Sequence, residues 1–347
     1  MTITALPTPR FPDPRKSPVL NWAVLAPGNI AHSFVTALHQ HTDQRAVSVG
    51  SSSAERAAEF AARHGITNSY GSYEAAVADP AVDAVYIASP HSHHLSLALI
   101  AIAAGKHVLV EKSITQTGAE ARELVAAAKS ANVLLMEAMW TRYLPHIDIL
   151  RQLIAGGDLG DIRYVAADFG FNHVDGDPSG RLLNPALAGG AMLDLGIYPV
   201  NFAEIVFETA GHGPLTEAVS QVAGVVTPTG VDGHVSMQLA TSGGAQAQLL
   251  TSLMVDTPCQ AQVLGSDAQV YIERMFFCPT GIEFRSGNGR LYWNQNITES
   301  SGGLAYEAAH FARLVEQGAL ESDLHSLAAT VDFMDYADQV RRDLGTL

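Results

Sequence analysis

The sequence predicts an α/β protein of two domains, and three features of the chain support this fold class. Its 347 residues are more than one hydrophobic core usually organises. Up to Met136, short apolar runs alternate with helical patterns, which predicts a parallel, doubly wound sheet. Beyond Met136 the apolar residues recur in period two with few helices between the runs, which predicts an α+β domain with an open, mostly antiparallel sheet.

In the first domain the elements follow one another as in βαβ units. The expected strands are 20–25, 46–50, 84–88, 107–110 and 133–136; helices are expected after the turn at 26–31 and over 54–64, 73–78, 95–104 and 117–131. Ser53 offers an N-cap to the helix that begins at residue 54. We assign residues 19–136 to this domain and expect the proline-rich segment 1–18 to be a flexible extension.

The second domain is predicted from residues 137–347. Its expected strands are 161–171, 218–226, 234–240, 245–253, 260–265 and 269–273. Helical patterns cover 144–155, 190–208 and the tail 306–342. We therefore expect one α+β domain that ends in helices.

Composition and charge exclude several classes of protein. Lys and Arg number 20 against 35 Asp and Glu, a formal net charge of -15, which argues against nucleic acid and anionic membranes as partners. Cys259 and Cys278 are the only cysteines, too few for a disulfide framework or a cysteine metal cage. The start of the chain lacks an apolar run of signal-peptide length, and no uncharged apolar stretch is long enough to span a bilayer. These features predict a cytoplasmic protein that binds small molecules.

The turn between the first strand and the first helix predicts a dinucleotide site. Residues 26–31 read Ala-Pro-Gly-Asn-Ile-Ala, where the usual Rossmann pattern is G-x-G-x-x-G/A. Such a turn lets backbone amides approach a pyrophosphate at the positive end of a helix. A simple tight turn would explain the motif equally well, but its position in a βαβ unit favours the nucleotide. The residues expected to contact the cofactor here are Ala26, Gly28, Asn29 and Ile30.

The end of the second strand favours NADP(H) over NAD(H). Sites for NAD usually place Asp or Glu there to bind the ribose 2′-hydroxyl. Here the residues are Ser51, Ser52 and Ser53, followed by Arg56, and no carboxylate is present to repel a 2′-phosphate. The serines would also cap the next helix in the absence of any nucleotide.

Four segments resemble a known family. They read Ser-Pro-His-Ser-His-His (89–94), Gly-Lys-His-Val-Leu-Val-Glu-Lys (105–112), Glu-Ala-Met-Trp-Thr-Arg-Tyr (137–143) and Gly-Gly-Ala-Met-Leu-Asp-Leu-Gly-Ile-Tyr (189–198). In this order and spacing they resemble the glucose-fructose oxidoreductase/inositol dehydrogenase (Gfo/Idh/MocA) family. Within it, they look most like the branch of dimeric dihydrodiol dehydrogenases and NADP-dependent D-xylose dehydrogenases. The resemblance covers nearly the whole chain after residue 18.

The resemblance implies roles for several side chains. Lys112 matches the catalytic lysine at the end of a strand, and Tyr198, in place of the family's histidine, matches the acid/base of the dihydrodiol branch. Asp194 lies one helical turn before Tyr198 and would project from the same face. Trp140 and Arg142 match positions that line the substrate pocket, which Asp194 and Tyr198 complete. The residues implied to lie beside the cofactor are Ser89, Pro90, His91, His94, Glu111 and Lys112.

The chemistry of hydride transfer supports these roles independently. Oxidation of an alcohol needs a base for the hydroxyl proton, and reduction of a carbonyl needs the corresponding acid. A free tyrosine has a pKa of about 10, and a nearby ammonium such as Lys112 would stabilise the phenolate and lower that pKa. Lys112 also follows a parallel strand at its carboxyl end, where open α/β sheets bind ligands.

Each assignment also has a structural alternative. A lysine after a strand is usually a solvated strand end, and a tyrosine in an apolar helix is usually part of the core. Asp194 could equally cap a helix or form an ion pair. The histidines at 91, 93 and 94 lack a companion carboxylate and open a helix, so we expect no metal site.

Two positions depart from the family pattern. Ser113 follows Lys112 where the family has a proline that often follows a cis peptide, and a cis bond to serine costs about 2.5–4 kcal/mol. Either the bond is trans and Lys112 shifts slightly, or the site tolerates strain. Ala26, in place of the first glycine, leaves open how closely a pyrophosphate approaches.

The sequence and the resemblance together predict an NADP(H)-dependent oxidoreductase. It would move a hydride to or from the CH–OH carbon of a sugar, polyol or trans-dihydrodiol. The alternatives are an NADPH-dependent reductase of a keto- or anhydro-sugar and a weakly catalytic nucleotide-binding regulator. The resemblance also implies a homodimer or homotetramer that packs through the open sheet of the second domain.

Overall fold

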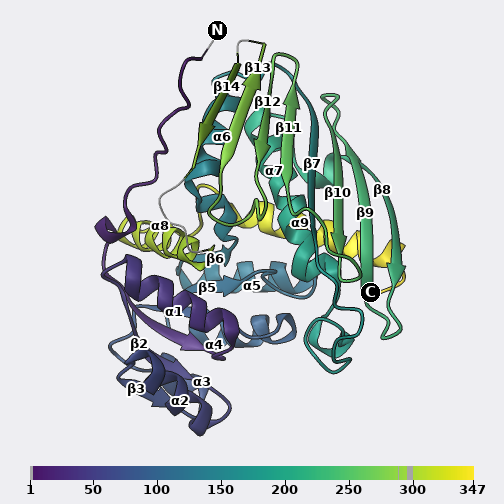
Figure 1. Cartoon of the computed structure of the whole chain (residues 1–347). Helices are drawn as coiled ribbons and strands as arrows, with labels where there is room; N and C mark the ends of the chain where they lie inside the picture. The colour runs from purple at the N-terminus through teal and green to yellow at the C-terminus, as the bar shows by residue number, and fades with distance from the viewer. Residues whose placement is uncertain (1–2, 288, 295–299) are drawn as a thin grey trace. The chain divides into compact units, whose positions relative to one another are not determined.

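The computed structural model describes residues 3–287, 289–294 and 300–347, and the chain forms two compact units (Figure 1). The first, which we call the parallel-sheet unit, contains Pro12–Tyr143 and Ser301–Val331. The second, the mixed-sheet unit, contains Met1–Phe11, Leu144–Ser300 and Asp332–Leu347. These boundaries differ from the predicted ones after residues 18 and 136, because segments far apart in the sequence pack into the same unit.

Six parallel strands form the sheet of the parallel-sheet unit, in the order β3-β2-β1-β4-β5-β6. They are β1 (Asn21–Leu25), β2 (Arg45–Gly50), β3 (Asn68–Tyr70), β4 (Ala84–Ile87), β5 (His107–Glu111) and β6 (Leu135–Ala138). The order reverses at β1, which pairs with both β2 and β4. Open α/β sheets bind ligands beyond the carboxyl ends of the strands at such a point. The predicted doubly wound sheet is confirmed, with the short β3 added.

Local sequence signals set the limits of the helices in this unit. They are α1 (Asn29–His41), α2 (Ala54–His64), α3 (Tyr73–Val77), α4 (His94–Ala103), α5 (Gly118–Ala131) and α8 (Leu304–Glu316). Ser53 caps α2 as predicted, because its side chain accepts a hydrogen bond from the backbone N–H of Arg56. The helix ends at Gly65, whose φ of 67° lies in the left-handed region that glycine favours.

The contacts of Trp22 explain why residues 301–331 belong to this unit. The side chain is fully buried on β1, and its ring centroid lies 5.5 Å from that of Phe34 and 5.0 Å from that of Phe311 on α8. Its Nε1–H donates to Oε1 of Gln44 at 2.8 Å, and Nε2 of Gln44 donates to the carbonyl of Ala308 at 3.3 Å. The first strand and a helix near the end of the chain therefore share one core.

Eight strands form the sheet of the mixed-sheet unit, in the order β14-β13-β12-β11-β7-β10-β9-β8. They are β7 (Ile162–Gly170), β8 (Val219–Val226), β9 (Asp232–Ala240), β10 (Gln246–Ser252), β11 (Ala261–Gly265), β12 (Ala268–Ile272), β13 (Ile282–Ser286) and β14 (Gly289–Trp293). Neighbours are antiparallel except β7 and β10, which are parallel. The mostly antiparallel sheet is confirmed. The prediction missed β13 and β14, although residues 282–286 alternate in period two.

One face of this sheet is covered and the other is polar. Helix α7 (Ile197–Ala210) packs on β7 and β10 and against α6 (Pro145–Ala155), as Figure 1 shows. Along β9, Val235 and Met237 are buried, whereas Gln238 between buried positions is exposed. A cavity of about 790 Å³ lies on the sheet, lined in part by Gln238, Gln248 and Arg285. The helix α9 (Leu327–Asp343) begins in the parallel-sheet unit and continues into this one.

The start of the chain, predicted to be a flexible extension, makes contacts with α6 that the sequence analysis did not predict. Arg10 donates from Nη2 to Oδ1 of Asp148 at 2.5 Å and from its backbone N–H to Oδ2 at 2.7 Å. Asp148 lies on α6 and is buried, so its carboxylate is paired by a residue 138 positions earlier. The ion pair joins distant residues, and no local pattern signals it. The mobility of residues 3–18 stays a prediction.

The segment Pro185–Ala210 is long and apolar enough to cross a membrane by length and composition. The sequence analysis did not predict a membrane span here, because Asp194 and Glu204 interrupt the apolar run. Its most apolar window is wholly buried within the structure, as in core helices of soluble proteins, so it is weak evidence for a membrane span.

Candidate functional site

A cavity of about 250 Å³ lies in the parallel-sheet unit, beyond the carboxyl ends of β1, β2 and β4. Its lining residues are Ala26, Pro27, Gly28, Ser51, Arg56, Tyr73, Ala88, Ser89, Pro90, His93 and Leu97. The structure thus brings together six of the residues predicted to bind the cofactor: Ala26, Gly28, Ser51, Arg56, Ser89 and Pro90. The prediction missed the other five: Pro27 and Ala88, which adjoin predicted positions, Tyr73 from α3, His93 from the turn before α4, and Leu97 from α4 itself.

The turn after β1 brings the start of α1 to the cavity. Ala26 has a φ of 59°, so it takes the left-handed conformation that the first glycine of the pattern usually provides. Gly28 is the N-cap of α1, and a Cβ there would meet only the carbonyl oxygen of Ala88 at 3.9 Å. The helix therefore starts at the cavity with open space above its first turn. Asn29 and Ile30 begin α1 but do not line the cavity.

The three serines after β2 have different surroundings. Ser51 is buried and its hydroxyl accepts from the backbone N–H of Ser53 at 3.2 Å. The Ser52 hydroxyl accepts from Nη2 of Arg56 at 2.9 Å, and both side chains lie at the protein surface. This contact holds the Arg56 guanidinium beside Ser51 at the cavity. Ser52 and Ser53 themselves do not line it.

Side chains hold the backbone around Lys112, which follows β5. The ring of His91 has Nε2 3.2 Å from the carbonyl oxygen of Lys112, and the ring of His94 has Nδ1 2.9 Å from that of Ser113. The other His94 nitrogen lies 2.8 Å from the carbonyl of Ser89. Burial lowers the His94 pKa to about 4, against the raising effect of the hydrogen bonds with the Ser89 and Ser113 backbone. The peptide bond between Lys112 and Ser113 is cis. Of the two alternatives left open by the sequence, a trans bond is therefore excluded.

His91 and His94 therefore act on the lysine segment and do not line the cavity. The same is true of Glu111, which is buried at the end of β5. Its carboxylate accepts hydrogen bonds from the Tyr86 hydroxyl and, at 3.2 Å, from the backbone N–H of Lys112. These three side chains support the backbone at Lys112, and their contact with a cofactor stays a prediction.

Helix α8 contributes a second buried carboxyl group to this unit. Glu307 is fully buried, and neither carboxylate oxygen accepts a hydrogen bond from the described residues. Burial, and then the charge of Glu111, raise the pKa of Glu307 well above its usual value. The native state therefore binds a proton at Glu307 that the unfolded chain releases above its ordinary pKa of 4.5.

We expect Glu307→Met to stabilise the protein by about 1–4 kcal/mol at pH 8, because an apolar side chain of similar size removes the buried acid. The stability of the parent falls as pH rises above 4.5, since its native state holds the extra proton. The gain should therefore be largest at pH 8 and shrink towards pH 5. Thermal unfolding at both values measures it. Glu316→Met, at an exposed position of the same helix, is the control, and equal shifts for both variants would contradict the prediction.

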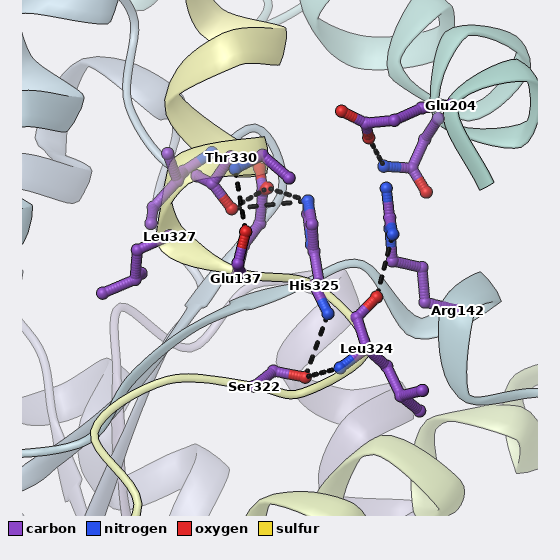
Figure 2. A network of polar contacts seen from close by, with 12 residues as sticks. Glu137, Arg142, Glu204, Ser322, Leu324, His325, Leu327 and Thr330 are labelled. Atoms are coloured by element: carbon purple, nitrogen blue, oxygen red, sulfur yellow. Dashed lines mark hydrogen bonds and ion pairs between the residues drawn. The ribbon is translucent and has the colours of Figure 1, made fainter. Parts of the chain in front are cut away.

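A polar network lies at the end of β6 and includes Glu137 (Figure 2). Its Oε1 accepts from the backbone N–H of Ile114 at 2.8 Å, and its Oε2 accepts from the Thr330 hydroxyl at 3.2 Å. Nε2 of His325 lies 3.7 Å from the same Oε2. Burial raises the pKa of Glu137 to about 7. Sequence reasoning missed all three side chains of this network, because Glu137 on β6 lies 193 residues before Thr330, and His325 just precedes the helix of Thr330.

Trp140 and Arg142, predicted to line the substrate pocket, lie in the turn Trp140–Tyr143 and are buried. The Arg142 guanidinium donates from Nη1 to the carbonyl of Leu324 at 2.8 Å (Figure 2). Its side chain is fully buried. A role in substrate binding stays a prediction for both residues.

Tyr198 lies in the first turn of α7 in the mixed-sheet unit. Its ring centroid is 4.3 Å from that of Phe277 and 5.6 Å from that of Phe169. Residues Met192–Gly196, just before the helix, form a π-helical turn where the prediction had a continuous α-helix. Such turns often occur at functional sites. Asp194 in this turn forms an ion pair with Arg181 at 2.5 Å, which is the structural alternative expected for it.

No group of three or more His, Cys, Asp or Glu side chains that could bind a metal occurs in the part of the chain that the structure describes. Cys259 and Cys278 are both buried free thiols.

Comparison with known proteins identifies the family of both units. Residues 20–139 match the model of the Gfo/Idh/MocA oxidoreductase family with an NAD-binding Rossmann fold, and residues 147–271 match its C-terminal domain. The trans-1,2-dihydrobenzene-1,2-diol dehydrogenases of Sus scrofa and Homo sapiens are each 35% identical to the chain, covering 94% of it and 97% of the relative.

Solved structures share the fold at lower identity. The aldose-aldose oxidoreductase from Caulobacter crescentus complexed with glycerol aligns with a TM-score of 0.82 and 24% identity, over 93% of this chain and 96% of the other. The 3-ketoreductase KijD10 from Actinomadura kijaniata in complex with NADP aligns with a TM-score of 0.75 and 24% identity, over 93% and 97%. The chain is therefore an oxidoreductase with an NAD(P)-binding Rossmann domain, and it belongs to the Gfo/Idh/MocA family.

Proposed function

We propose that the protein is an NADP(H)-dependent oxidoreductase that acts on a CH–OH group of a sugar, polyol or trans-dihydrodiol. The observation that carries this proposal is the 250 Å³ cavity, where the turn at Gly28 meets Ser51 and Arg56 at the carboxyl ends of parallel strands. The relatives named trans-1,2-dihydrobenzene-1,2-diol dehydrogenase, which match 94% of the chain, support a diol or a related cyclic polyol as substrate.

The preference for NADP(H) rests on the charge of the cavity. Among the described residues that line it, none is Asp or Glu, and Arg56 supplies a guanidinium. A carboxylate at this position would bind the ribose 2′-hydroxyl of NAD and repel a 2′-phosphate. A guanidinium and serine hydroxyls instead donate hydrogen bonds to phosphate oxygens.

A nicotinamide cofactor held by Gly28, Ser51 and Arg56 would supply the hydride acceptor or donor for the carbon that bears the hydroxyl group. Tyr198 takes the proton of that hydroxyl, and returns it in the reverse direction. The Lys112 ammonium stabilises the negative charge that develops on the oxygens during transfer. Asp194 orients a second hydroxyl of the substrate, and Trp140 provides an apolar wall that suits a sugar or cyclic diol.

The first test is binding of the two nucleotides. Purified protein is titrated with NADPH and with NADH, followed by quenching of tryptophan fluorescence. Tighter binding of NADPH supports the proposal and justifies a screen of polyols, aldoses and trans-diols with NADP⁺. Binding of neither nucleotide, or NADPH binding with no turnover of any substrate in either direction, would contradict it. A reduction rate far above the oxidation rate would favour the reductase alternative.

We expect Arg56→Ala to weaken NADPH binding about tenfold or more while the Kd for NADH changes less than twofold. A hydrogen bond to a charged group contributes about 1.5–3 kcal/mol, and NADH lacks the phosphate that would receive it. Fluorescence titration with both nucleotides measures the difference. Arg63→Ala removes an arginine from the last turn of the same helix and is the matched control. Equal weakening of both nucleotides would remove the argument for NADP(H).

We also propose that the polar face of the mixed sheet is the surface through which copies of the chain form a homodimer or homotetramer. Its cavity of about 790 Å³ lies over β7 and β9 to β13 and is lined by both Glu283 and Arg285. Light scattering of the purified protein tests this, and a monomer at micromolar concentration would exclude it. The two free thiols support a reducing compartment such as the cytoplasm.

A further inference from the structure

The Lys112 segment begins where the β5–β6 pairing stops. The last pair of the parallel ladder joins Glu111 on β5 to Ala138 on β6. Beyond it the register of β5 with β6 ends, so the N–H of Ile114 finds its acceptor outside this ladder. A buried N–H left without an acceptor would cost about 1–3 kcal/mol. A side chain from β6 supplies the acceptor.

That side chain is Glu137, whose Oε1 accepts from the backbone N–H of Ile114 at 2.8 Å. Both residues are buried, with Ile114 fully inaccessible to solvent. The carboxylate thus continues the hydrogen bonding of β5 with β6 two residues beyond the proposed catalytic lysine. A shift of the Ile114 backbone would move the start of the Lys112 side chain directly, because only Ser113 separates them.

A second set of contacts holds Glu137 itself (Figure 2). Its Oε2 accepts from the Thr330 hydroxyl at 3.2 Å, and that hydroxyl lies 3.4 Å from Nε2 of His325. Thr330 belongs to the first turns of α9, so a helix from the end of the chain secures the carboxyl group behind the lysine segment. Both oxygens of Glu137 therefore have partners on different segments.

The chemistry of the site argues that this carboxyl group has a task besides packing. Burying a carboxyl group is costly, and burial raises the Glu137 pKa to about 7, against the lowering effects of Ile114, Thr330 and Arg142. An apolar residue would avoid that cost but would leave the Ile114 N–H unpaired. The group is therefore placed where a fixed acceptor is needed, beside the reactive segment.

We infer that Glu137 is a positioning residue for the hydride-transfer reaction, which holds Lys112 in its productive orientation through the Ile114 backbone, with Thr330 as its anchor. The inference rests on the proposed function, because it takes Lys112 to be the catalytic lysine. A displacement of about 1 Å in such a group can lower turnover about a hundredfold.

A double-mutant cycle between Glu137 and Lys112 tests this inference. We expect Glu137→Ala to lower kcat about ten- to a hundredfold in the parent protein and less than twofold in a Lys112→Met background. A purely structural role would give the same factor in both backgrounds. Fluorescence titration with NADPH provides a readout besides activity, and its Kd and stoichiometry should stay within threefold for every variant. Equal factors in the two backgrounds would overturn the inference.

Glu137→Gln is the conservative variant. Its amide oxygen can accept from Ile114 and its NH₂ group can bond the Thr330 hydroxyl, so we expect kcat within threefold of the parent. A loss as large as that of Glu137→Ala would overturn the positioning role. If Glu137→Ala does not fold, Thr330→Val replaces it in the cycle, because it removes the anchor and leaves the carboxyl group in place. Thr330→Val should lower kcat about three- to tenfold in the parent and not at all in the Lys112→Met background.

The cycle also separates failure of this inference from failure of the proposed function. If Lys112→Met alone leaves kcat unchanged, Lys112 is not the catalytic lysine and both proposals fall. If Lys112→Met lowers kcat but the effect of Glu137→Ala is equal in both backgrounds, the proposed function stands and the positioning role is wrong.

Discussion

Replacing Tyr198 by phenylalanine should lower kcat about 10²- to 10⁴-fold, the contribution usual for a positioned acid or base. The ring would keep its contacts with Phe169 and Phe277, because only the hydroxyl is removed. Nucleotide binding should stay within threefold, because Tyr198 is not among the residues that line the cavity proposed for the nucleotide. Steady-state kinetics with the best substrate of the screen, together with NADPH titration, measures both quantities.

Tyr336→Phe is the matched control for this variant. Tyr336 is also a buried tyrosine of the mixed-sheet unit, and its hydroxyl lies 3.1 Å from that of Ser220. Loss of that hydrogen bond should reduce stability by about 0.5–1.5 kcal/mol and leave kcat unchanged. A Tyr198→Phe protein with the turnover of the parent would show that another group transfers the proton.

Lys112→Met should lower kcat about 10²- to 10³-fold, which is the effect of removing one preorganised group that stabilises developing charge. Methionine keeps much of the length and the apolar part of the side chain. The fold should persist, because the contacts of His91, His94 and Glu137 are with the backbone of residues 112–114, which the substitution leaves in place. The measurement is kcat at saturating nucleotide, with binding stoichiometry as the test of folding.

Lys106→Met is the control, since Lys106 immediately precedes the opposite end of the same strand, β5. The Nζ of Lys106 donates to the carbonyl of Val82 at 2.6 Å, at the end of β5 opposite Lys112. Loss of this hydrogen bond should lower stability and leave kcat unchanged. Equal turnover in Lys112→Met and Lys106→Met would exclude Lys112 from the chemistry and favour the regulator alternative.

Much of the fold could be predicted because its signals are local. Strands of the parallel sheet are short apolar runs, and α2 begins at a serine cap, so period and capping residues suffice to place them. The strand β3 was missed because Asn-Ser-Tyr carries no apolar period. The π-helical turn at Met192–Gly196 was missed because an inserted residue in a helix leaves the apolar pattern almost unchanged.

The candidate site was predictable in part for the same reason. Gly28, Ser51 and Ser89 follow three different strands, and the carboxyl ends of parallel strands meet at one edge of a sheet. Tyr73 and His93 also line the cavity, but Tyr73 begins the short α3 and His93 ends the turn before α4, and the placement of both depends on packing. The contacts of the His94 ring with the backbone of Ser89 and Ser113 were not predictable, because they depend on how the loops after β4 and β5 pack.

The sequence by itself determined the class of sheet in each half of the chain, the turn at Gly28 and the residue types available for catalysis. These depend on spacing along the chain and on side-chain chemistry. The tertiary structure alone decided which distant segments meet: α8 beside Trp22, Arg10 on Asp148, and Thr330 on Glu137 behind Ile114. Such contacts join residues separated by many elements, and they form because buried apolar and polar groups need partners that only the folded chain can provide.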